Sequence, residues 1–146
     1  MYRQLRIGLV ILFISTGVAP AAVAPTNATV EIDGQRFTTE LAENDATRQR
    51  GLMNREKMAP DHGMLFVFPD SAVRTFWMKN TEIPLDMLFF DDQRKLINVQ
   101  QRVPPCLSDP CPLYSSAGPA RYVLELNGGQ ADAIGVKPGD ELRIQR

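Results

Sequence analysis

Short apolar runs separated by glycine, proline and aspartate constrain the fold of this chain more than any other sequence feature. Asp33-Gly34 supplies the positive φ angles of a tight type I′ turn, which predicts a hairpin over 29–32 and 35–41. The continuous apolar run over 64–68, bounded by glycine and proline, predicts a strand buried on both faces. Further strands are predicted over 74–78, 85–90, 96–102, 121–126 and 141–144.

Two short helices complete the predicted elements. Asn44 or Asp45 can cap a helix that continues through Arg50, and Gly51 would end it. Residues 130–134 predict one or two helical turns. Seven or eight short strands with turn signals between them predict a single, mainly β domain at the α+β margin. A small barrel and a sandwich both fit this pattern.

The first residues have the features of an export signal. Arg3 and Arg6 form a positive region, and the apolar stretch over 7–18 follows them. That stretch is too short for a transmembrane helix, which needs roughly 20 apolar residues. We therefore expect a periplasmic or secreted protein; an uncleaved membrane anchor is the alternative.

The cleavage point sets the predicted domain organisation. An Ala-x-Ala site at 22–24 would leave Pro25 as the first mature residue, so we expect cleavage after Ala21 instead. The expected organisation is a signal over 1–21 (extending to 24 under the other cleavage), a tether over 22–28 and one β-rich domain over 29–146. After cleavage no membrane association is expected.

The two cysteines of the chain, Cys106 and Cys111, lie in a loop that contains four prolines. In an exported protein two neighbouring thiols are expected to form a disulfide. The alternative, a redox-active dithiol, normally has two intervening residues at the start of a helix. Zinc would need more ligands than these cysteines and His62 supply, so no metal is expected.

The charge balance bears on possible partners. The formal net charge is −1 over the whole chain, and removing the signal makes the rest slightly more acidic. Nucleic-acid binding depends on clustered positive charge, and no such cluster occurs. We therefore expect no nucleic-acid partner.

Several motifs together resemble family 192 of the domains of unknown function, small bacterial and archaeal proteins that are often exported. The resemblance covers about residues 30–146 and implies a compact β-rich domain. It implies no activity and no catalytic residues. The motifs that carry it are Gly51-Leu-Met-Asn-Arg55, Gly63-Met-Leu-Phe-Val-Phe68, Phe76-Trp-Met-Lys-Asn-Thr81, Pro84-Leu-Asp86, Tyr122-Val-Leu-Glu125 and Gly139-Asp140.

The polar connection between two apolar strands is the candidate binding surface. Lys79, Asn80 and Thr81 follow one predicted strand, and Asp86 lies within the next. Polar segments held between rigid strands commonly carry binding groups. Lys79 could pair with an anion, Asn80 can donate and accept, and Asp86 can act as an acceptor or base. Tyr114, after the cysteine loop, is a further candidate for lining the same pocket.

A purely structural role fits some of the same residues. Asp86 lies in an apolar stretch, so it must find donors if it is buried, and Lys79, Arg55 or backbone amides could supply them. Asp86 and Asn80 would then simply tie a loop by hydrogen bonds. Arg55 and Glu125 could likewise form a buried ion pair.

Aromatic and sulfur-bearing side chains suggest two further hypotheses. Trp77 or Phe76 could stack on a flat ligand, but adjacent strand residues point to opposite faces, so at most one should line a given pocket. Thioethers suit Cu(I), although methionine usually fills gaps in the core. The methionines concerned are Met53, Met58, Met64, Met78 and Met87.

Three functions from different classes follow. The first is a non-catalytic module of the cell envelope that binds a small molecule or an envelope protein. The second is an enzyme acting on a small or glycan-like substrate, with Asp86 or Glu125 as acid or base. The third is copper handling through the methionines. No cofactor is expected for the binding module.

Overall fold

The computed structural model describes residues 26–146, so the predicted signal and its cleavage site lie outside the described residues. No helix in the described part of the chain is long and apolar enough to cross a membrane. The elements, in chain order, are β1 (Asn27–Ile32), β2 (Gln35–Ala42), α1 (Asp45–Arg50), β3 (His62–Phe76), β4 (Leu85–Phe90), β5 (Leu96–Val103), β6 (Tyr114–Asn127), α2 (Gln130–Ile134) and β7 (Arg143–Gln145).

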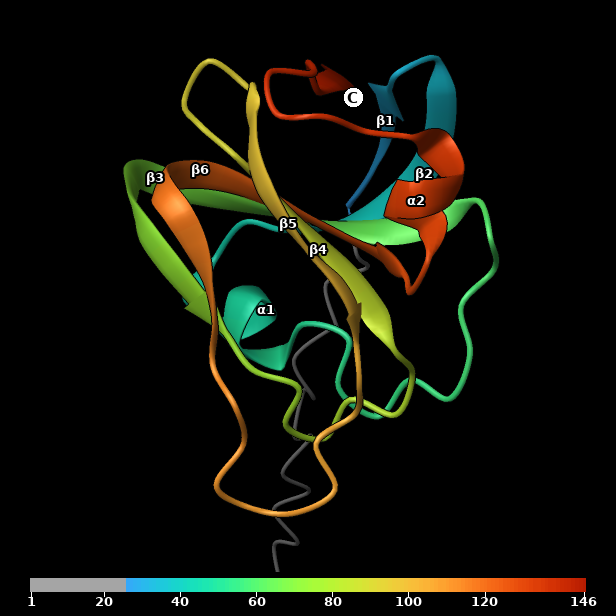
Figure 1. Ribbon diagram of the computed structural model, residues 1–146, viewed down its shortest axis with the longest axis vertical. Helices are drawn as coiled ribbons and strands as arrows, with labels where there is room; N and C mark the ends of the chain where they lie inside the picture. Colours follow the sequence, from blue (N-terminus) through green and yellow to red (C-terminus); the bar gives the residue numbers. More distant parts are fainter. Residues whose placement is uncertain (1–25) are drawn as a thin grey trace, which may run out of the picture.

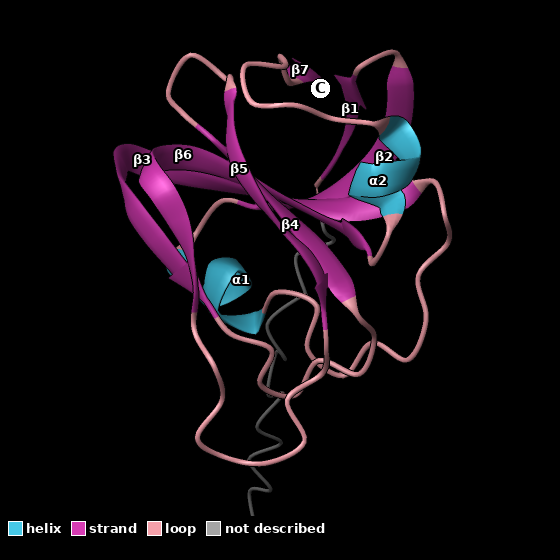
Figure 2. Ribbon diagram, in the orientation of Figure 1, coloured by secondary structure: helices cyan, strands magenta, loops and turns pink. Residues whose placement is uncertain are grey.

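Within the described residues the strands form one seven-stranded sheet in the order β5-β4-β6-β3-β2-β1-β7 (Figures 1 and 2). All neighbouring pairs are antiparallel except β2 and β3, which are parallel. Parallel neighbours need a crossover connection, and α1 lies in the connection between them. A capping box between Asn44 and Thr47 fixes the start of α1, where the sequence predicts it.

The hairpin between β1 and β2 forms at the predicted turn. Asp33 and Gly34 both have positive φ, 46° and 77°, which matches the right-handed twist of the flanking strands. The turn sets the register, with Ile32 opposite Gln35 and Val30 opposite Phe37.

The sheet curls so that its two edges meet at one end. The Leu96 amide at the start of β5 donates to the carbonyl of Asp140, and the Leu142 amide donates to the carbonyl of Arg94. These bonds connect the β5 edge to the segment just before β7. The prediction of a mainly β domain with two short helices is confirmed, and the architecture is a curled half-barrel rather than two stacked sheets.

Two strands are much longer than the sequence predicts. The strand predicted over 121–126 is β6, which begins at Tyr114. The strands predicted over 64–68 and 74–78 are one, because β3 continues through Pro69 to Phe76. The ladder to β6 is interrupted between Val67 and Ala72 and then resumes, so the proline lies in a bulge where no ladder hydrogen bond is needed. The bulge bends β3, and its second half reaches the region of α1 (Figure 1).

Alternation along the central strands creates two buried faces. On β6, Leu124 and Leu126 belong to one core cluster, which α2 joins through Ala131. Val123 belongs to the other cluster, which includes Leu52 just after α1. Odd and even residues of one strand point to opposite faces, so Glu125 lies on the Val123 face.

Candidate functional site

The described chain buries two carboxyl groups, and one of them is that of Glu125, on β6. Its neighbours across the ladder are Met64 on β3 and Met87 on β4. Both methionines are buried, and Glu125 itself is 4% exposed. Apolar side chains thus flank this carboxyl on both sides along the sheet.

Glu125 makes no hydrogen bond or ion pair with any described residue, and burial alone raises its pKa to about 8. An ionised carboxylate in apolar surroundings loses its hydration without compensation, so the neutral form is favoured. At neutral pH the group is therefore mostly a carboxylic acid, able to donate one hydrogen bond and accept others. A buried polar group without a protein partner is uncommon and calls for an explanation.

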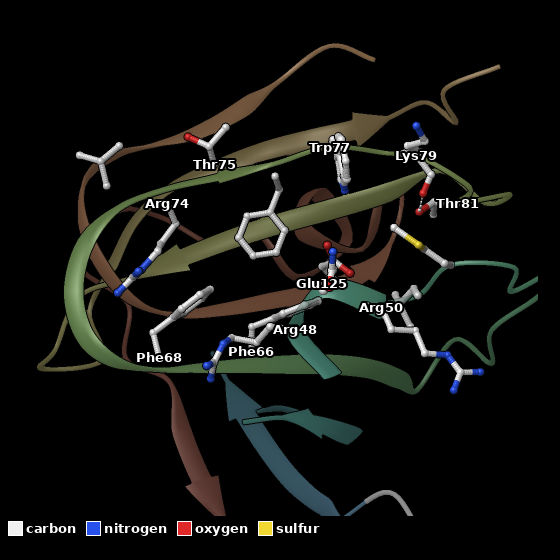
Figure 3. A pocket seen from close by; sticks show the side chains of 16 residues that line it. Arg48, Arg50, Phe66, Phe68, Arg74, Thr75, Trp77, Lys79, Thr81 and Glu125 are labelled. Carbon is white, nitrogen blue, oxygen red and sulfur yellow. Dashed lines mark hydrogen bonds between the residues drawn. The ribbon is translucent and has the colours of Figure 1, made fainter. Parts of the chain in front are cut away.

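Glu125 forms the floor of a pocket of about 380 Å³ beside α1 (Figure 3). The pocket is bounded by α1 and the residues after it, by the strand β3, and by the segment that follows β3. Its volume lies within the range of small-molecule sites in proteins. The carboxyl therefore faces a space that a ligand can enter.

Aromatic rings form much of the pocket wall. Phe66 and Phe76 pack edge to face with centroids 5.0 Å apart, and Phe68 and Phe76 do so at 6.4 Å. Trp77 also lines the pocket and is 46% exposed. Burial of the Glu125 carboxyl among apolar groups is the physical reason for its raised pKa.

Phe76 and Trp77 both line the pocket, contrary to the expectation that only one of them would. The alternation argument fails because β3 ends at Phe76 and Trp77 lies beyond it. Outside a strand, successive side chains need not point to opposite faces.

Basic side chains also line the pocket. Arg48 and Arg74 approach the ring of Phe68, with guanidinium carbons 5.3 and 4.0 Å from its centroid. Lys79 lies over the ring of Trp77, at 5.6 Å.

Three of the four basic side chains that line the pocket are paired with exposed carboxylates. Arg48 contacts Asp45 and Arg74 contacts Asp70, at 2.6 and 2.7 Å. Lys79 contacts Asp109 at 3.2 Å. Arg50, which also lines the pocket, has no such partner among the described residues. None of these four basic side chains points toward the carboxyl of Glu125.

Among the residues predicted from sequence, Lys79, Thr81 and Glu125 line this pocket together. Thr81 is buried, and its hydroxyl lies 3.5 Å from the carbonyl of Lys79. Asn80 is exposed with φ of 55°, and its carbonyl accepts a hydrogen bond from the amide of Asn54. Tyr114, at the start of β6, is half-buried and packs against the core cluster below the pocket.

Arg55 forms its ion pair with Glu40, at 2.6 Å, rather than with Glu125. Both residues line a neighbouring hollow of about 470 Å³. Within it, Arg55 pairs with Glu40 and Asn44 bonds to Thr47, and Arg50 is shared with the Glu125 pocket. Among the described residues that line the hollow, none has a buried carboxyl like that of Glu125.

Asp86 is on the opposite face of the sheet from Glu125 and is completely buried. Its carboxylate accepts hydrogen bonds from the backbone amides of Arg102, Gly129 and Ala131, at 2.7, 2.9 and 2.7 Å. Asp86 thus ties β4 to the end of β5 and to the start of α2. This is the structural role that the sequence left open as an alternative to a binding role.

Sequence reasoning did not select the basic side chains Arg48, Arg50 and Arg74. The first two lie on α1 and the third lies beyond the β3 bulge, so they meet only because of the crossover and the bend. One usable signal was present: Met64, Phe66 and Phe68 share one face of β3 by alternation. That face is the one on which Glu125 lies.

The methionines are mainly core residues. Met64, Met78 and Met87 are buried in one cluster, and Met58 packs against it. Met53 lines the Glu125 pocket. Among the described residues no three histidine, cysteine, aspartate or glutamate side chains group as in a metal site.

The predicted disulfide between Cys106 and Cys111 is confirmed, with the two Cα atoms 5.6 Å apart. The loop it closes is tied to the pocket at two points. The backbone of Cys106 bridges to that of Lys79, and Asp109 holds the Lys79 ammonium. The disulfide therefore braces one side of the pocket.

These features define a small, mainly β domain with a ligand-sized pocket over an unpartnered carboxyl. The chain belongs to the DUF192 family, described as "Uncharacterized ACR", whose model matches residues 28–144. The resemblance inferred from the sequence motifs is thereby confirmed.

Two crystal structures are similar to the chain over nearly their full lengths. One, described as a "putative transcription regulator" from Sinorhizobium meliloti 1021, is 39% identical, with a TM-score of 0.78, and the match covers 85% of this chain and 98% of that one. The other, a protein of unknown function from Novosphingobium aromaticivorans DSM 12444, is 35% identical, with a TM-score of 0.70, covering 88% and 99%. No functionally curated protein shows significant similarity to the chain.

Proposed function

We propose that this protein is an exported, non-catalytic module of the cell envelope that binds a small molecule in the pocket over Glu125. The observation that carries the proposal is the buried carboxyl of Glu125, which lines the pocket and has no partner among the described residues. Leaving such a group without a partner costs free energy, so its retention needs a reason outside the folded chain itself. A ligand that completes its hydrogen bonds supplies that reason.

The contrast with Asp86 supports this argument. Asp86 is equally inaccessible, yet it receives three backbone hydrogen bonds. The same sheet thus provides donors for a carboxyl that serves structure and none for the carboxyl that faces the pocket. The aromatic walls and a few convergent polar groups are the usual composition of a small-molecule site.

The pocket carries its own reporter of binding, because Trp77 is the single tryptophan of the chain and lines the pocket. We expect some members of a panel of envelope metabolites, including amino acids, organic acids, amines and short glycans, to change Trp77 emission and raise the melting temperature. Glu125→Gln should weaken binding of those ligands by about tenfold or more, since a buried hydrogen-bonding group left without its partner costs roughly 1–3 kcal/mol.

The matched control is Glu56→Gln, which changes an exposed glutamate outside the pocket and should bind as the unaltered protein does. A panel in which no ligand perturbs Trp77, or in which Glu125→Gln binds every ligand unchanged, would refute the proposal.

The exported location is supported by the N-terminal sequence and by the disulfide-closed loop. When the full chain is produced in a Gram-negative host, we expect it in the periplasmic fraction with a mature N-terminus at Ala22. Intact-mass measurement with and without thiol alkylation would show the cleavage point and an oxidised cysteine pair. Full-length protein in the cytoplasm with two free thiols would contradict the prediction.

A second function, acid–base catalysis on a small substrate, is favoured by one observation. A carboxyl with pKa near 8 in an accessible pocket has the properties of a general acid or base. Hydrolysis by paired carboxylates has less support, because Asp86 is on the other face and Glu125 is the single acidic residue lining the pocket among the described residues. Turnover of a panel ligand, lost in Glu125→Gln, would favour this function over simple binding.

A further inference from the structure

The acidic and basic side chains of the Glu125 pocket lie in different parts of it. Among the described residues the one acidic side chain of the pocket is the buried Glu125, and the basic side chains Arg48, Arg50, Arg74 and Lys79 also line it. In Figure 3 the Arg50 and Lys79 side chains point away from Glu125, toward the outside. A ligand that fits this arrangement must offer different chemistry at its two ends.

The floor matches a cationic donor. An ionised carboxylate accepts hydrogen bonds at both oxygens, and an ammonium group brings three donors together with the compensating charge. The aromatic walls add to this match, because cations are attracted to the faces of phenylalanine and tryptophan rings. The protein does not supply this cation, since Arg48, Arg74 and Lys79 are held by Asp45, Asp70 and Asp109.

The mouth matches an anion. Arg50 has no carboxylate partner among the described residues, and the ion pair of Lys79 with Asp109 is exposed. An exposed ion pair contributes little to stability, so Lys79 can accept a ligand's anionic group at small cost. Arg74 is largely buried and its guanidinium donates to backbone carbonyls, so it is a fixed part of the wall. The pocket is also lined by the apolar side chains of Phe76, Trp77 and Leu52.

We propose that the ligand is a small zwitterion whose ammonium group pairs with Glu125 at the pocket floor, whose anionic group lies at the basic mouth, and whose apolar body contacts Phe76 and Trp77. This inference rests on the proposed binding function and narrows its ligand class. It departs from the two simpler assignments, an organic anion held by the arginines alone and an amine held by Glu125 alone.

Binding of an ammonium group changes the protonation of Glu125. In the empty pocket the carboxyl holds a proton, because burial raises its pKa to about 8. When the ammonium enters, the carboxyl ionises, its proton leaves to solvent, and the ligand keeps all of its own protons. The other charged groups lining the pocket are Arg48 and Arg50 from α1, Arg74 from β3 and Lys79 after it.

The test compares ligands that share a body and differ in charge. One set is L-phenylalanine, 3-phenylpropanoate and 2-phenylethylamine; a second is 6-aminohexanoate, hexanoate and hexylamine. In at least one set we expect the zwitterion to bind the purified protein at least about tenfold more tightly than either partner, measured by Trp77 emission. Calorimetry of that zwitterion at pH 7 in buffers of different ionisation enthalpy should show release of about one proton per ligand bound.

Two variants test which end of the ligand contacts the pocket floor and which contacts the mouth. Glu125→Gln should abolish proton release and make the anion bind as well as the zwitterion. Arg50→Gln should keep proton release and reduce the advantage of the zwitterion over the amine, and Glu56→Gln should change neither.

Tighter binding of the anion or of the amine in both sets, or zwitterion binding without proton release, would overturn this inference. It would leave the binding function standing if Glu125→Gln still weakened that ligand. Failure of all six compounds would also overturn the zwitterion assignment, and the broader metabolite panel would then decide the proposed function separately.

Discussion

Replacing Glu125 with glutamine is expected to stabilise the protein relative to the unaltered chain, by an amount that grows as the pH rises from 5 to 9. Burial raises the pKa of Glu125 from 4.5 to about 8. Below pH 4.5 the carboxyl is protonated in both folded and unfolded chains. Between these two pKa values the unfolded chain gains by ionising while the folded protein keeps the proton, so the free energy of unfolding falls as the pH rises and levels off above pH 8.

The expected size of this stability difference follows from the conversion of one pKa unit into about 1.4 kcal/mol of free energy. The difference between Glu125→Gln and the unaltered protein should change by roughly 3 kcal/mol between pH 4 and pH 7, and by about 5 kcal/mol at pH 9. Glutamine has nearly the same shape and no charge, so the pH dependence isolates the ionisation from any packing difference.

Urea denaturation at closely spaced pH values, in the absence of ligand, measures this difference. Glu56→Gln is the control, since this exposed side chain should give a pH profile parallel to that of the unaltered protein. A Glu125→Gln profile that also runs parallel would mean that Glu125 is ionised in the folded state and has found a partner. That outcome would remove the observation on which the proposed function depends.

The stability expected to be gained when the Glu125 carboxyl is removed has a consequence for function. A group that destabilises the fold at neutral pH is retained when activity depends on it, and such trade-offs concentrate at binding and catalytic sites. A zwitterion in the pocket would reverse the effect, because the bound ammonium provides the charge and donors that the fold omits. Ligand binding and stability should therefore respond to Glu125→Gln in opposite directions.

Much of the fold follows from local sequence signals. The β1–β2 turn at Asp33-Gly34, the bounds of β4 and the position of α2 agree with prediction because each depends on near neighbours. The continuation of β3 past Pro69 was missed because a bulge, which depends on the facing strand, removes the need for the proline's hydrogen bond. The parallel pairing of β2 with β3 and the closure at Leu96 are likewise set by tertiary contacts.

The site was predictable in part for the same reason. Lys79, Thr81 and Glu125 were selected from polar residues near apolar strands, and they meet in one pocket. The sequence could not tell that Asp86 and Glu125 face opposite sides, because the register between β4 and β6 pairs Met87, not Asp86, with Glu125. A shift of one residue in that register would have placed both carboxyls on the same face of the sheet.

Loss of the Asp86 carboxylate is expected to have the opposite effect on stability from loss of Glu125. Three backbone amides, those of Arg102, Gly129 and Ala131, donate to it in a site without solvent access. In Asp86→Ala all three amides lose their acceptor, and each buried, unsatisfied donor costs about 1–3 kcal/mol. The expected destabilisation is roughly 4 kcal/mol or more, which is large against the usual stability of a small domain.

Asp86→Asn removes the negative charge of the side chain and keeps its shape. Its amide can orient so that the oxygen accepts from Gly129 and Ala131, but its –NH₂ group then faces the amide of Arg102, donor against donor. We therefore expect Asp86→Asn to be destabilising although it is isosteric, and less so than Asp86→Ala. Asp92→Ala, at an exposed aspartate, should change stability by less than about 0.5 kcal/mol.

Urea denaturation at pH 7 gives the three free energies, and Trp77 emission gives ligand affinity in the fraction that remains folded. Because Asp86 lies across the sheet from the pocket, ligand affinity should be preserved while stability is lost. A loss below about 1 kcal/mol in both Asp86 variants would contradict the structural role. Weakened binding in a folded Asp86 variant would instead mean that the α2 face of the sheet is coupled to the pocket through the β4–β6 ladder.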